Sequence, residues 1–325
     1  MDPRVAAELA AHEGTDGELV DSLFRLVLRR EPDPDARERA VAKLAEGTLS
    51  RASLVHELAS SDEFRRVREL DDAVALGLGA RARRERIRWL QAPPETDERV
   101  VEIPWVLSRL RTAGRVLDVG YAFAEPAYLA GLLRADIEVA GVDLAVRDVG
   151  PMESVQADIR ALPFPDRSFD QVLLVSTLEH IGADNTVYGL AAERDDDSRL
   201  VALLELARVL ERDGSLLVTV PLGEPGDHGW FRQEDERGWT SLFVGAGLFT
   251  EELEAYELGA DGWRAAPSFE PEGVRYGERG PAASAVLCAD LSPGRLRHLL
   301  TPGGLGKATR RRAARTYRRI RPHDL

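Results

Sequence analysis

The stretch RVLDVGYAFAEP, residues 115–126, decides the fold prediction. An apolar run leads into Asp118 and Gly120, a pattern typical of a buried strand that ends in a ligand-binding turn. A dinucleotide-binding loop would carry further glycines where this chain has Ala122 and Ala124. Because a pyrophosphate must approach backbone amides closely, the two alanines disfavour a dinucleotide. The stretch therefore predicts a strand followed by a loop for a ligand without a pyrophosphate.

From residue 101 onward, strand patterns alternate with helical patterns, which predicts a parallel sheet with crossover helices. The expected strands are 115–119, 138–142, 153–156, 170–175, 215–220, 251–258 and 283–290, and the expected helices are 101–112, 124–134 and 197–210. No convincing helix separates the last two strands, so they are predicted to form an antiparallel hairpin. The fold prediction is an α/β, Rossmann-like sheet, mostly parallel with an antiparallel last strand.

The N-terminal part of the chain has a different pattern. Apolar residues recur three and four positions apart over 15–70, which predicts helices interrupted near Pro32 and Gly47. This part contains no cluster of convergent polar groups, so we expect an all-α module that serves protein contacts. Residues 81–98 predict one more helix, ending before Pro93. The expected organisation is a helical module over 1–95, a second domain over 96–302 and a basic tail over 303–325.

Composition narrows the class of protein. The chain has 325 residues, a net charge of -13 and a single cysteine, Cys288, which excludes an intrachain disulfide. No apolar run approaches the ~20 residues that span a bilayer, and the N-terminus is not of the signal type, so we expect a cytoplasmic protein without a transmembrane segment. The negative charge disfavours nucleic acid as a partner. The basic segment 306–321 is interpreted as a solvated tail, with nucleic acid or an anionic membrane as the alternative.

Acidic and polar residues follow the predicted strands at the carboxyl edge of the sheet, where open α/β folds bind ligands. Asp143 is placed to accept hydrogen bonds from the vicinal hydroxyls of a ribose. Asp158 can accept one from an exocyclic amine while Ile159 covers the face of a purine. Ser176 ends the fourth strand, and a Glu-His pair lies just beyond it. Each aspartate alone is most often a turn former, but the set at this spacing predicts a nucleoside site.

These stretches together resemble the class I S-adenosylmethionine-dependent methyltransferases. The resemblance covers 115–221, through RVLDVGYAFAEP, VAGVDLA, VQADIRALPFPDRSFDQVLLVSTLEHIG and LLELARVLERDGSLLVTVP. VEIPWVL, GDHGWFRQED and GADGW resemble a subgroup associated with glycan modification. The resemblance implies S-adenosylmethionine as the cofactor, bound by Asp118, Gly120, Ala122, Ala124, Asp143, Leu144, Asp158, Ile159 and Ser176. A sulfonium cofactor has no phosphate, which fits the alanines in the first loop.

The run LFRLVLRREPDPDARERAVAKLAEGTLSRASLVHELASSDEF resembles a helical domain that is distantly similar to phycobilisome linkers. The pattern matches at Arg30, Pro32, Asp33, Gly47, Ser50, Arg51, Ser60 and Phe64. Such domains often precede enzymes that modify glycans, and their role is uncharacterised. This resemblance and the previous one together favour a glycan, a glycan precursor or a glycosylated metabolite as the methyl acceptor.

The catalytic prediction rests on the Glu-His pair. Methyl transfer to a sugar hydroxyl gains from a base, and His180 follows the strand that would face the methyl group, with Glu179 beside it. The alternative is that the pair caps the next segment. Some relatives place Glu-x-x-Glu-His and a later histidine around a divalent metal. Here Ser176 replaces the first glutamate, so a metal held by Glu179, His180 and His228 is not favoured.

Two segments beyond the fourth and fifth strands are predicted to close over the acceptor. They supply the candidate acceptor-binding residues Tyr188, His228, Trp230 and Arg232. Aromatic faces with polar neighbours suit a sugar or another ring. The prediction is an O-methyltransferase for a sugar hydroxyl. The alternatives are a methyltransferase for another small molecule or RNA, and a non-catalytic module that only binds the cofactor.

Overall fold

The computed structural model describes residues 11, 13–190, 194–280 and 282–293. The chain divides into two compact units, Met1–Asp72 and Ala73–Leu325. The expected boundaries near residues 95 and 302 stay predictions, and the basic tail at 303–325 lies outside the described residues. No helix in the described part is long and apolar enough to cross a membrane.

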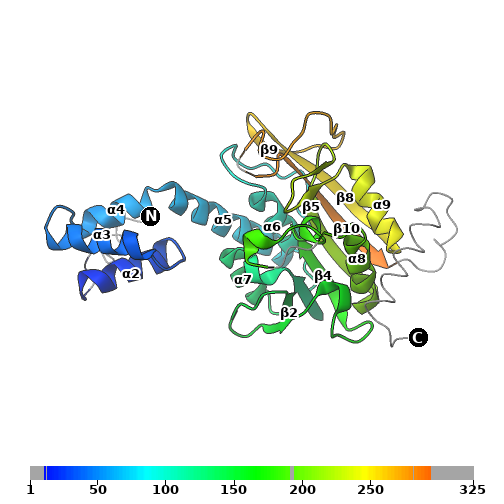
Figure 1. The fold of residues 1–325 in the computed structure, drawn as a ribbon, viewed down its shortest axis with the longest axis horizontal. Helices are drawn as coiled ribbons and strands as arrows, with labels where there is room; N and C mark the ends of the chain where they lie inside the picture. The colour runs from blue at the N-terminus through cyan, green and yellow to red at the C-terminus, as the bar shows by residue number, and fades with distance from the viewer. Residues whose placement is uncertain (1–10, 12, 191–193, 281, 294–325) are drawn as a thin grey trace. The chain divides into compact units, whose positions relative to one another are not determined.

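The first unit consists of helices, as the fold prediction expected. They are α2 (Asp16–Val27), α3 (Pro34–Ala45), α4 (Arg51–Ala59) and the first half of α5 (Asp62–Ala82) (Figure 1). Thr15 and Glu18 form a reciprocal capping box at the start of α2. The core of the unit contains Leu19, Leu23 and Leu54. The predicted breaks therefore separate helices that pack through their apolar faces.

The predicted helix that begins at residue 81 and ends before Pro93 is wrong. Helix α5 ends at Ala82, and the chain then continues without regular structure towards Pro93. Ala92 exchanges two backbone hydrogen bonds with Trp263, at 2.8 and 3.2 Å. Arg86 pairs with Glu252 at 3.1 Å. Arg86 and Arg88 of this segment thus form tertiary ion pairs with Glu252, and the backbone groups of Ala92 are satisfied by the sheet.

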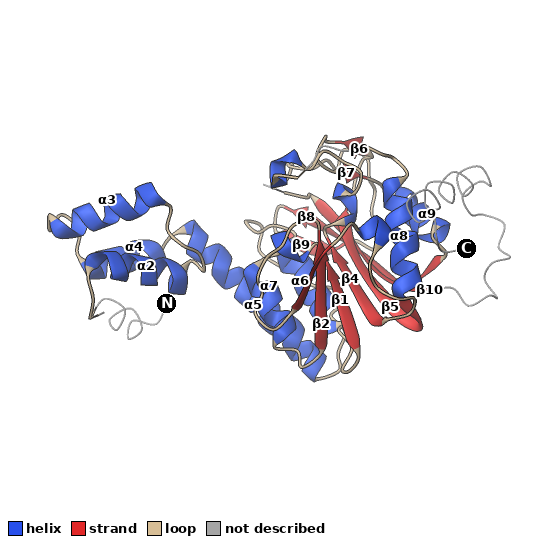
Figure 2. Cartoon of the chain, turned by 60° about the horizontal axis from the view of Figure 1, so that its bottom comes forward, coloured by secondary structure: helices blue, strands red, loops and turns tan. Residues whose placement is uncertain are grey.

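The second unit is built on one eight-stranded sheet, shown in Figure 2, with the order β3-β2-β1-β4-β5-β10-β8-β9. The strands are β1 (Arg115–Val119), β2 (Glu138–Asp143), β3 (Glu153–Gln156), β4 (Phe169–Val175), β5 (Leu210–Pro221), β8 (Leu248–Gly259), β9 (Gly262–Ala265) and β10 (Ala285–Pro293). Strands β1 to β5 pair in parallel, whereas β10 pairs antiparallel with both β5 and β8. This confirms the predicted α/β sheet with an antiparallel end.

Helices flank this sheet. They are α6 (Arg99–Ser108), α7 (Pro126–Leu133), α8 (Ser198–Val209) and α9 (Glu236–Gly245). Helix α8 packs against β5 and α9 against β8, while α6 packs against α7 and β10. The middle of β4 is completely buried at Val172, Leu173 and Leu174, as expected for a parallel strand covered on both faces.

The segment 223–239, predicted to be an acceptor-covering loop, is more ordered than expected. It contains two short paired strands, β6 (Gly226–Asp227) and β7 (Arg232–Gln233), and it runs into α9, which the sequence interpretation missed. Asp235 caps α9 by accepting a hydrogen bond from the Gly238 N–H at 2.6 Å. Trp239 is completely buried and donates its indole N–H to Pro221 O at 2.9 Å. Trp239 is therefore a core residue.

Candidate active site

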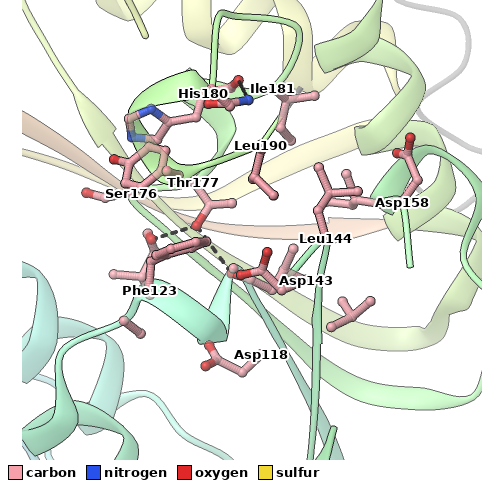
Figure 3. A pocket seen from close by; sticks show the side chains of 18 of the residues that line it. Asp118, Phe123, Asp143, Leu144, Asp158, Ser176, Thr177, His180, Ile181 and Leu190 are labelled. Carbon is pink, nitrogen blue, oxygen red and sulfur yellow. Dashed lines mark hydrogen bonds between the residues drawn. The ribbon is translucent and has the colours of Figure 1, made fainter. Parts of the chain in front are cut away.

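A cavity of about 440 Å³ lies at the carboxyl ends of β1, β2 and β4 (Figure 3). Eight of the nine predicted cofactor residues line it: Asp118, Gly120, Ala124, Asp143, Leu144, Asp158, Ile159 and Ser176. The ninth, Ala122, is not part of the lining, but its N–H donates to Asp143 Oδ2 at 3.1 Å. The carboxyl edge of the sheet thus brings the predicted residues together around one cavity, which will be called the wide cavity.

Gly120 is required by the geometry at the end of β1. Its φ is +85°, and a Cβ atom placed there would lie 2.4 Å from Thr177 Oγ1. The Gly120 N–H donates to Val142 O at 2.9 Å, which ties the turn to β2. Only glycine adopts this backbone without strain and leaves room for the neighbouring strand end.

Asp118 lies at the base of the wide cavity and is 2% exposed. Its Oδ1 accepts a hydrogen bond from the Tyr128 hydroxyl at 2.9 Å, while its buried Oδ2 has no partner among the described residues. Burial raises the pKa of Asp118 to about 7. The carboxyl group is therefore partly protonated near neutral pH, and a cationic group in the cavity would favour its ionised form.

Asp143 and Asp158 differ in how much of their hydrogen-bonding capacity is used. The Asp143 carboxylate accepts from the Ala122 and Ala145 N–H groups, both at 3.1 Å, and burial raises its pKa. Asp158 forms a 2.6 Å ion pair with Arg160. Burial alone would raise the Asp158 pKa, but hydrogen bonds from Arg160 lower it below its usual value. Asp158 is thus a charged, paired group that the sequence interpretation had treated as open.

Ser176 is hydrogen-bonded to Glu102, which in turn pairs with Arg99, and the sequence interpretation missed both charged residues. Its φ is +41°, and its hydroxyl donates to Glu102 Oε1 at 2.6 Å. Arg99 pairs with Glu102 Oε2 at 2.7 Å and lines the wide cavity. Glu102 is completely buried. The sequence did contain a signal for this pair, because Glu102 interrupts the apolar run of α6. A charged side chain that is buried in a helix of this kind needs a partner of opposite charge.

A second cavity, of about 60 Å³, adjoins the wide cavity and will be called the small cavity. Arg99, Ser176, His180 and Tyr188 line both cavities. Among the further residues of the small cavity are Glu98, Glu179, Trp230, Phe231 and Tyr276. In Figure 3, His180 and Ser176 lie at the opposite end of the wide cavity from Asp158.

The Glu179-His180 pair lies at the junction of the two cavities. His180 Nδ1 lies 2.9 Å from Trp230 O, and because a carbonyl can only accept, Nδ1 carries the proton and leaves Nε2 unprotonated. Burial lowers the His180 pKa to about 4 and raises the Glu179 pKa to about 8. Both side chains are therefore mostly neutral near pH 7. The two approach each other at 3.8 Å between His180 Nε2 and Glu179 Oε1.

The four predicted acceptor residues are not all brought to the site. Tyr188 and Trp230 line the small cavity and contact the His180 ring, with ring centroids at 5.5 and 5.1 Å. His228 and Arg232 line neither cavity: His228 stacks on Phe231 at 4.4 Å, and Arg232 pairs with Asp196. Within the described ranges, no three His, Cys, Asp or Glu side chains gather in a way that could hold a metal ion. The alternative set Glu179, His180 and His228 is thus not assembled.

Comparison with known proteins gives two family matches. Residues 117–218 match the family described as "Methyltransferase domain", and residues 5–67 match "Domain of unknown function (DUF4214)". No curated protein matches the chain.

Solved structures similar to the chain share little sequence with it. One is the 1,6-didemethyltoxoflavin-N1-methyltransferase of Burkholderia thailandensis, with 1,6-didemethyltoxoflavin and S-adenosylhomocysteine bound. It is 16% identical, with 85% of this chain and 91% of that chain covered and a TM-score of 0.42. A possible histamine N-methyltransferase from Thermotoga maritima is 16% identical over 70% of this chain and 97% of its own, with a TM-score of 0.38. The second unit has the α/β fold of the class I methyltransferases, and residues 117–218 within it match the methyltransferase-domain family.

Proposed function

We propose that the protein transfers the methyl group of S-adenosylmethionine to an acceptor bound beside His180. The observation that carries the proposal is the order of groups along one cavity. In Figure 3, Asp158 lies at one end and Ser176 with His180 at the other, with Asp143 between them and Asp118 at the base. Ile159, which follows Asp158 in the chain, also lines the cavity. In S-adenosylmethionine the adenine is joined to the ribose and the ribose to the sulfonium sulfur, which carries the methyl group and the methionine chain as two branches. The methyl group can therefore face Ser176 and His180 while the methionine chain turns towards Asp118. A volume of about 440 Å³ is within the range of small-molecule sites.

Each part of the cofactor has a chemical counterpart in the wide cavity. The Asp143 carboxylate can accept from the ribose hydroxyls in addition to its two backbone donors, since each oxygen has two lone pairs. The open Asp118 Oδ2 suits the methionine ammonium group. Ile159 and Leu144 offer apolar surface to the adenine ring. These residues would bind and orient the cofactor, which itself supplies the electrophilic methyl group.

The acceptor in this proposal is a sugar hydroxyl of a glycan, a glycan precursor or a glycosylated metabolite. Methyl transfer from a sulfonium is an in-line displacement, so the acceptor oxygen must lie on the axis through sulfur and the methyl carbon. His180 Nε2 is unprotonated and lies next to both cavities, so it can take the hydroxyl proton. The rings of Tyr188 and Trp230 provide faces against which a sugar ring can pack.

The proposal is tested in two steps. Calorimetry with S-adenosylmethionine and S-adenosylhomocysteine measures binding, with Asp143→Ala as the control that should weaken it. A transfer assay with labelled methyl then compares sugar nucleotides, oligosaccharides, phenolic metabolites and RNA as acceptors. Binding followed by labelling of a sugar is the expected result. Absence of cofactor binding would reject the methyltransferase proposal, and binding without transfer to any acceptor would instead support a non-catalytic module.

A further inference from the structure

The small cavity is lined by more carboxylates than cations. Glu98 and Glu179 line it, and Glu102 lies directly behind Ser176. Of the described residues around this cavity, Arg99 is the only one with an ammonium or guanidinium group. Arg99 is engaged by Glu102 at 2.7 Å. The charge of Arg99 is thus paired with that of Glu102. Within the ranges that the structure describes, Glu98 and Glu179 line the cavity without a salt bridge to a cationic side chain of their own.

Glu179 is the strongest sign that a ligand group belongs here. It is 4% exposed, and its Oε2 atom is buried without a hydrogen-bond partner in the described part of the chain. Glu98 is 8% exposed, and its Oε2 accepts one bond from the Ala283 N–H at 3.2 Å. A buried carboxyl group that is charged and lacks a donor destabilises the fold. A donor entering the cavity would relieve that destabilisation.

The remaining walls of the small cavity are aromatic. Trp230 and Tyr276 stand nearly perpendicular to each other, at 89° with centroids 6.2 Å apart, and Phe231 lies 4.6 Å from Tyr276. His180 stacks on Trp230. Aromatic faces carry partial negative charge and attract cations within ~6 Å of the ring centroid. At about 60 Å³ the cavity has room for a few water-sized groups, which matches an amine and its attached carbon.

We propose that the small cavity binds a protonated amine of the acceptor, seated between the Glu98 and Glu179 carboxylates and the faces of Trp230 and Tyr276. The acceptor is therefore an amine-bearing molecule, which within the proposed substrate class means an amino sugar. This inference rests on the proposed function for the identity of the reaction, but the binding itself is independent of methyl transfer. A neutral hydroxyl in the same place would not favour ionisation of the two carboxyl groups and would gain no charge–charge attraction from them.

The protonation states agree with this assignment and provide a second readout. Burial raises the pKa of Glu98 to about 7 and that of Glu179 to about 8, so in the empty cavity Glu179 is mostly protonated at neutral pH and Glu98 is partly protonated. The other charged and titratable groups that face them are Arg99, Glu102, His180 and the Tyr188 and Tyr276 hydroxyls. An ammonium group favours the ionised carboxylates, so its binding should release a proton to the buffer.

Cyclohexylamine and cyclohexanol make a matched pair of probes, because they share the ring and differ in the charged group. Both are titrated by calorimetry into the full chain saturated with S-adenosylhomocysteine, at pH 7.5 in two buffers of different ionisation enthalpy. The amine should bind at least tenfold more tightly than the alcohol and release a proton. Glu179→Gln should abolish the preference and Glu98→Gln should reduce it several-fold. Glu236→Gln, an exposed carboxylate outside both cavities, should leave it intact.

Two results would overturn the inference: binding of the amine that is no tighter than that of the alcohol, including failure of both to bind, or a preference that persists in both Glu179→Gln and Glu98→Gln. Trp230→Leu tests the aromatic wall separately and should lower the affinity for the amine more than the affinity for the alcohol. Loss of S-adenosylhomocysteine binding would count against the proposed function and not against the amine site. In that case the same titrations are made on the chain alone.

Discussion

The two ends of the site differ in how the chain builds them. The wide cavity takes its polar groups from the ends of neighbouring parallel strands, and Asp118 and Asp143 belong to two strands that pair in register. The small cavity collects Glu98, Glu179 and Tyr276 from segments far apart in the second unit. Sheet geometry therefore fixes the wide cavity, which is the proposed cofactor end of the site, while loop packing fixes the small cavity, which is the proposed acceptor end. Substitutions at the first should affect cofactor binding, and those at the second should affect acceptor recognition and turnover.

The largest effect is expected at the turn after β1. Gly120→Ala places a Cβ atom 2.4 Å from Thr177 Oγ1 and forces alanine into a φ of +85°. Thr177 cannot yield freely, because its hydroxyl also bonds Val175 O at 2.9 Å. We expect cofactor affinity to fall by at least about 100-fold and the free energy of unfolding to drop by about 2–4 kcal/mol. Calorimetry and thermal denaturation measure the two quantities.

Gly150→Ala is the matched control for this prediction. Gly150 also has a positive φ, +62°, but nothing lies within 4 Å of the position of its Cβ. The control should lose only about 1 kcal/mol of stability and keep its cofactor affinity. Equal affinity in the two variants would show that the close contact with Thr177 does not shape the cofactor end.

At the acceptor end, His180→Asn should lower the methyl-transfer rate at saturating cofactor by about 10²–10⁴-fold, because it removes the proposed base. Cofactor affinity should change little. The control is His228→Asn, since His228 lines neither cavity. An unchanged rate in His180→Asn would reject His180 as the base. It would favour the alternative interpretation, in which Glu179 and His180 cap the next segment.

The same assay gives a pH profile with a defined sign. Burial lowers the His180 pKa to about 4, so the base form predominates at all pH values above that point. With both cofactor and acceptor saturating, so that protonation of Asp118 and Glu98 does not limit binding, the rate should therefore not fall between pH 7 and pH 5.5. A histidine with its usual pKa near 6.5 would begin to lose activity there. A loss of activity centred near pH 6.5 would show that His180 is more solvated during turnover than in the structure.

The contrast between the two ends also explains what the sequence could predict. Strand-end aspartates and the turn glycine are local features of a strand followed by a turn, so Asp118, Gly120 and Asp143 were found together. The Arg99–Glu102 ion pair is a local i,i+3 contact within α6, but its contact with Ser176 at the site is tertiary, as is the contribution of Tyr276, and no local pattern encodes either. The Asp158–Arg160 ion pair is different, because Arg160 follows Asp158 by only two residues and the pair was missed although its partners are neighbours in the sequence.

Glu179→Gln tests the buried carboxyl group of the small cavity through the pH dependence of the unfolding free energy. Burial raises the Glu179 pKa to about 8, compared with 4.5 for an exposed glutamate. Between these values the folded state keeps a proton that the unfolded state has released, so the wild-type chain loses stability as pH rises. Glutamine has no such dependence. The unfolding free energy of the variant, relative to that of the wild type, should therefore increase from pH 5 to pH 8 by an amount on the order of a few kcal/mol.

Thermal denaturation across this pH range measures the difference. Glu236→Gln, at an exposed position, should show no such trend relative to the wild type. A difference between Glu179→Gln and the wild type that is constant from pH 5 to pH 8 would contradict a buried, protonated Glu179 at the acceptor end.

The smallest effect is expected for Tyr128→Phe, which removes the hydroxyl that donates to Asp118 Oδ1 at 2.9 Å. This hydrogen bond lowers the pKa of a carboxyl group that burial has raised to about 7, so its loss should raise the pKa further. Cofactor affinity should then fall by about tenfold or less near pH 7, consistent with ~1 kcal/mol for one hydrogen bond, and recover as pH rises. Calorimetry between pH 6.5 and pH 8.5 tests this. Tyr276→Phe removes a hydroxyl from the small cavity instead and should leave cofactor affinity unchanged, whereas equal effects of the two changes would mean that the two ends of the site are coupled.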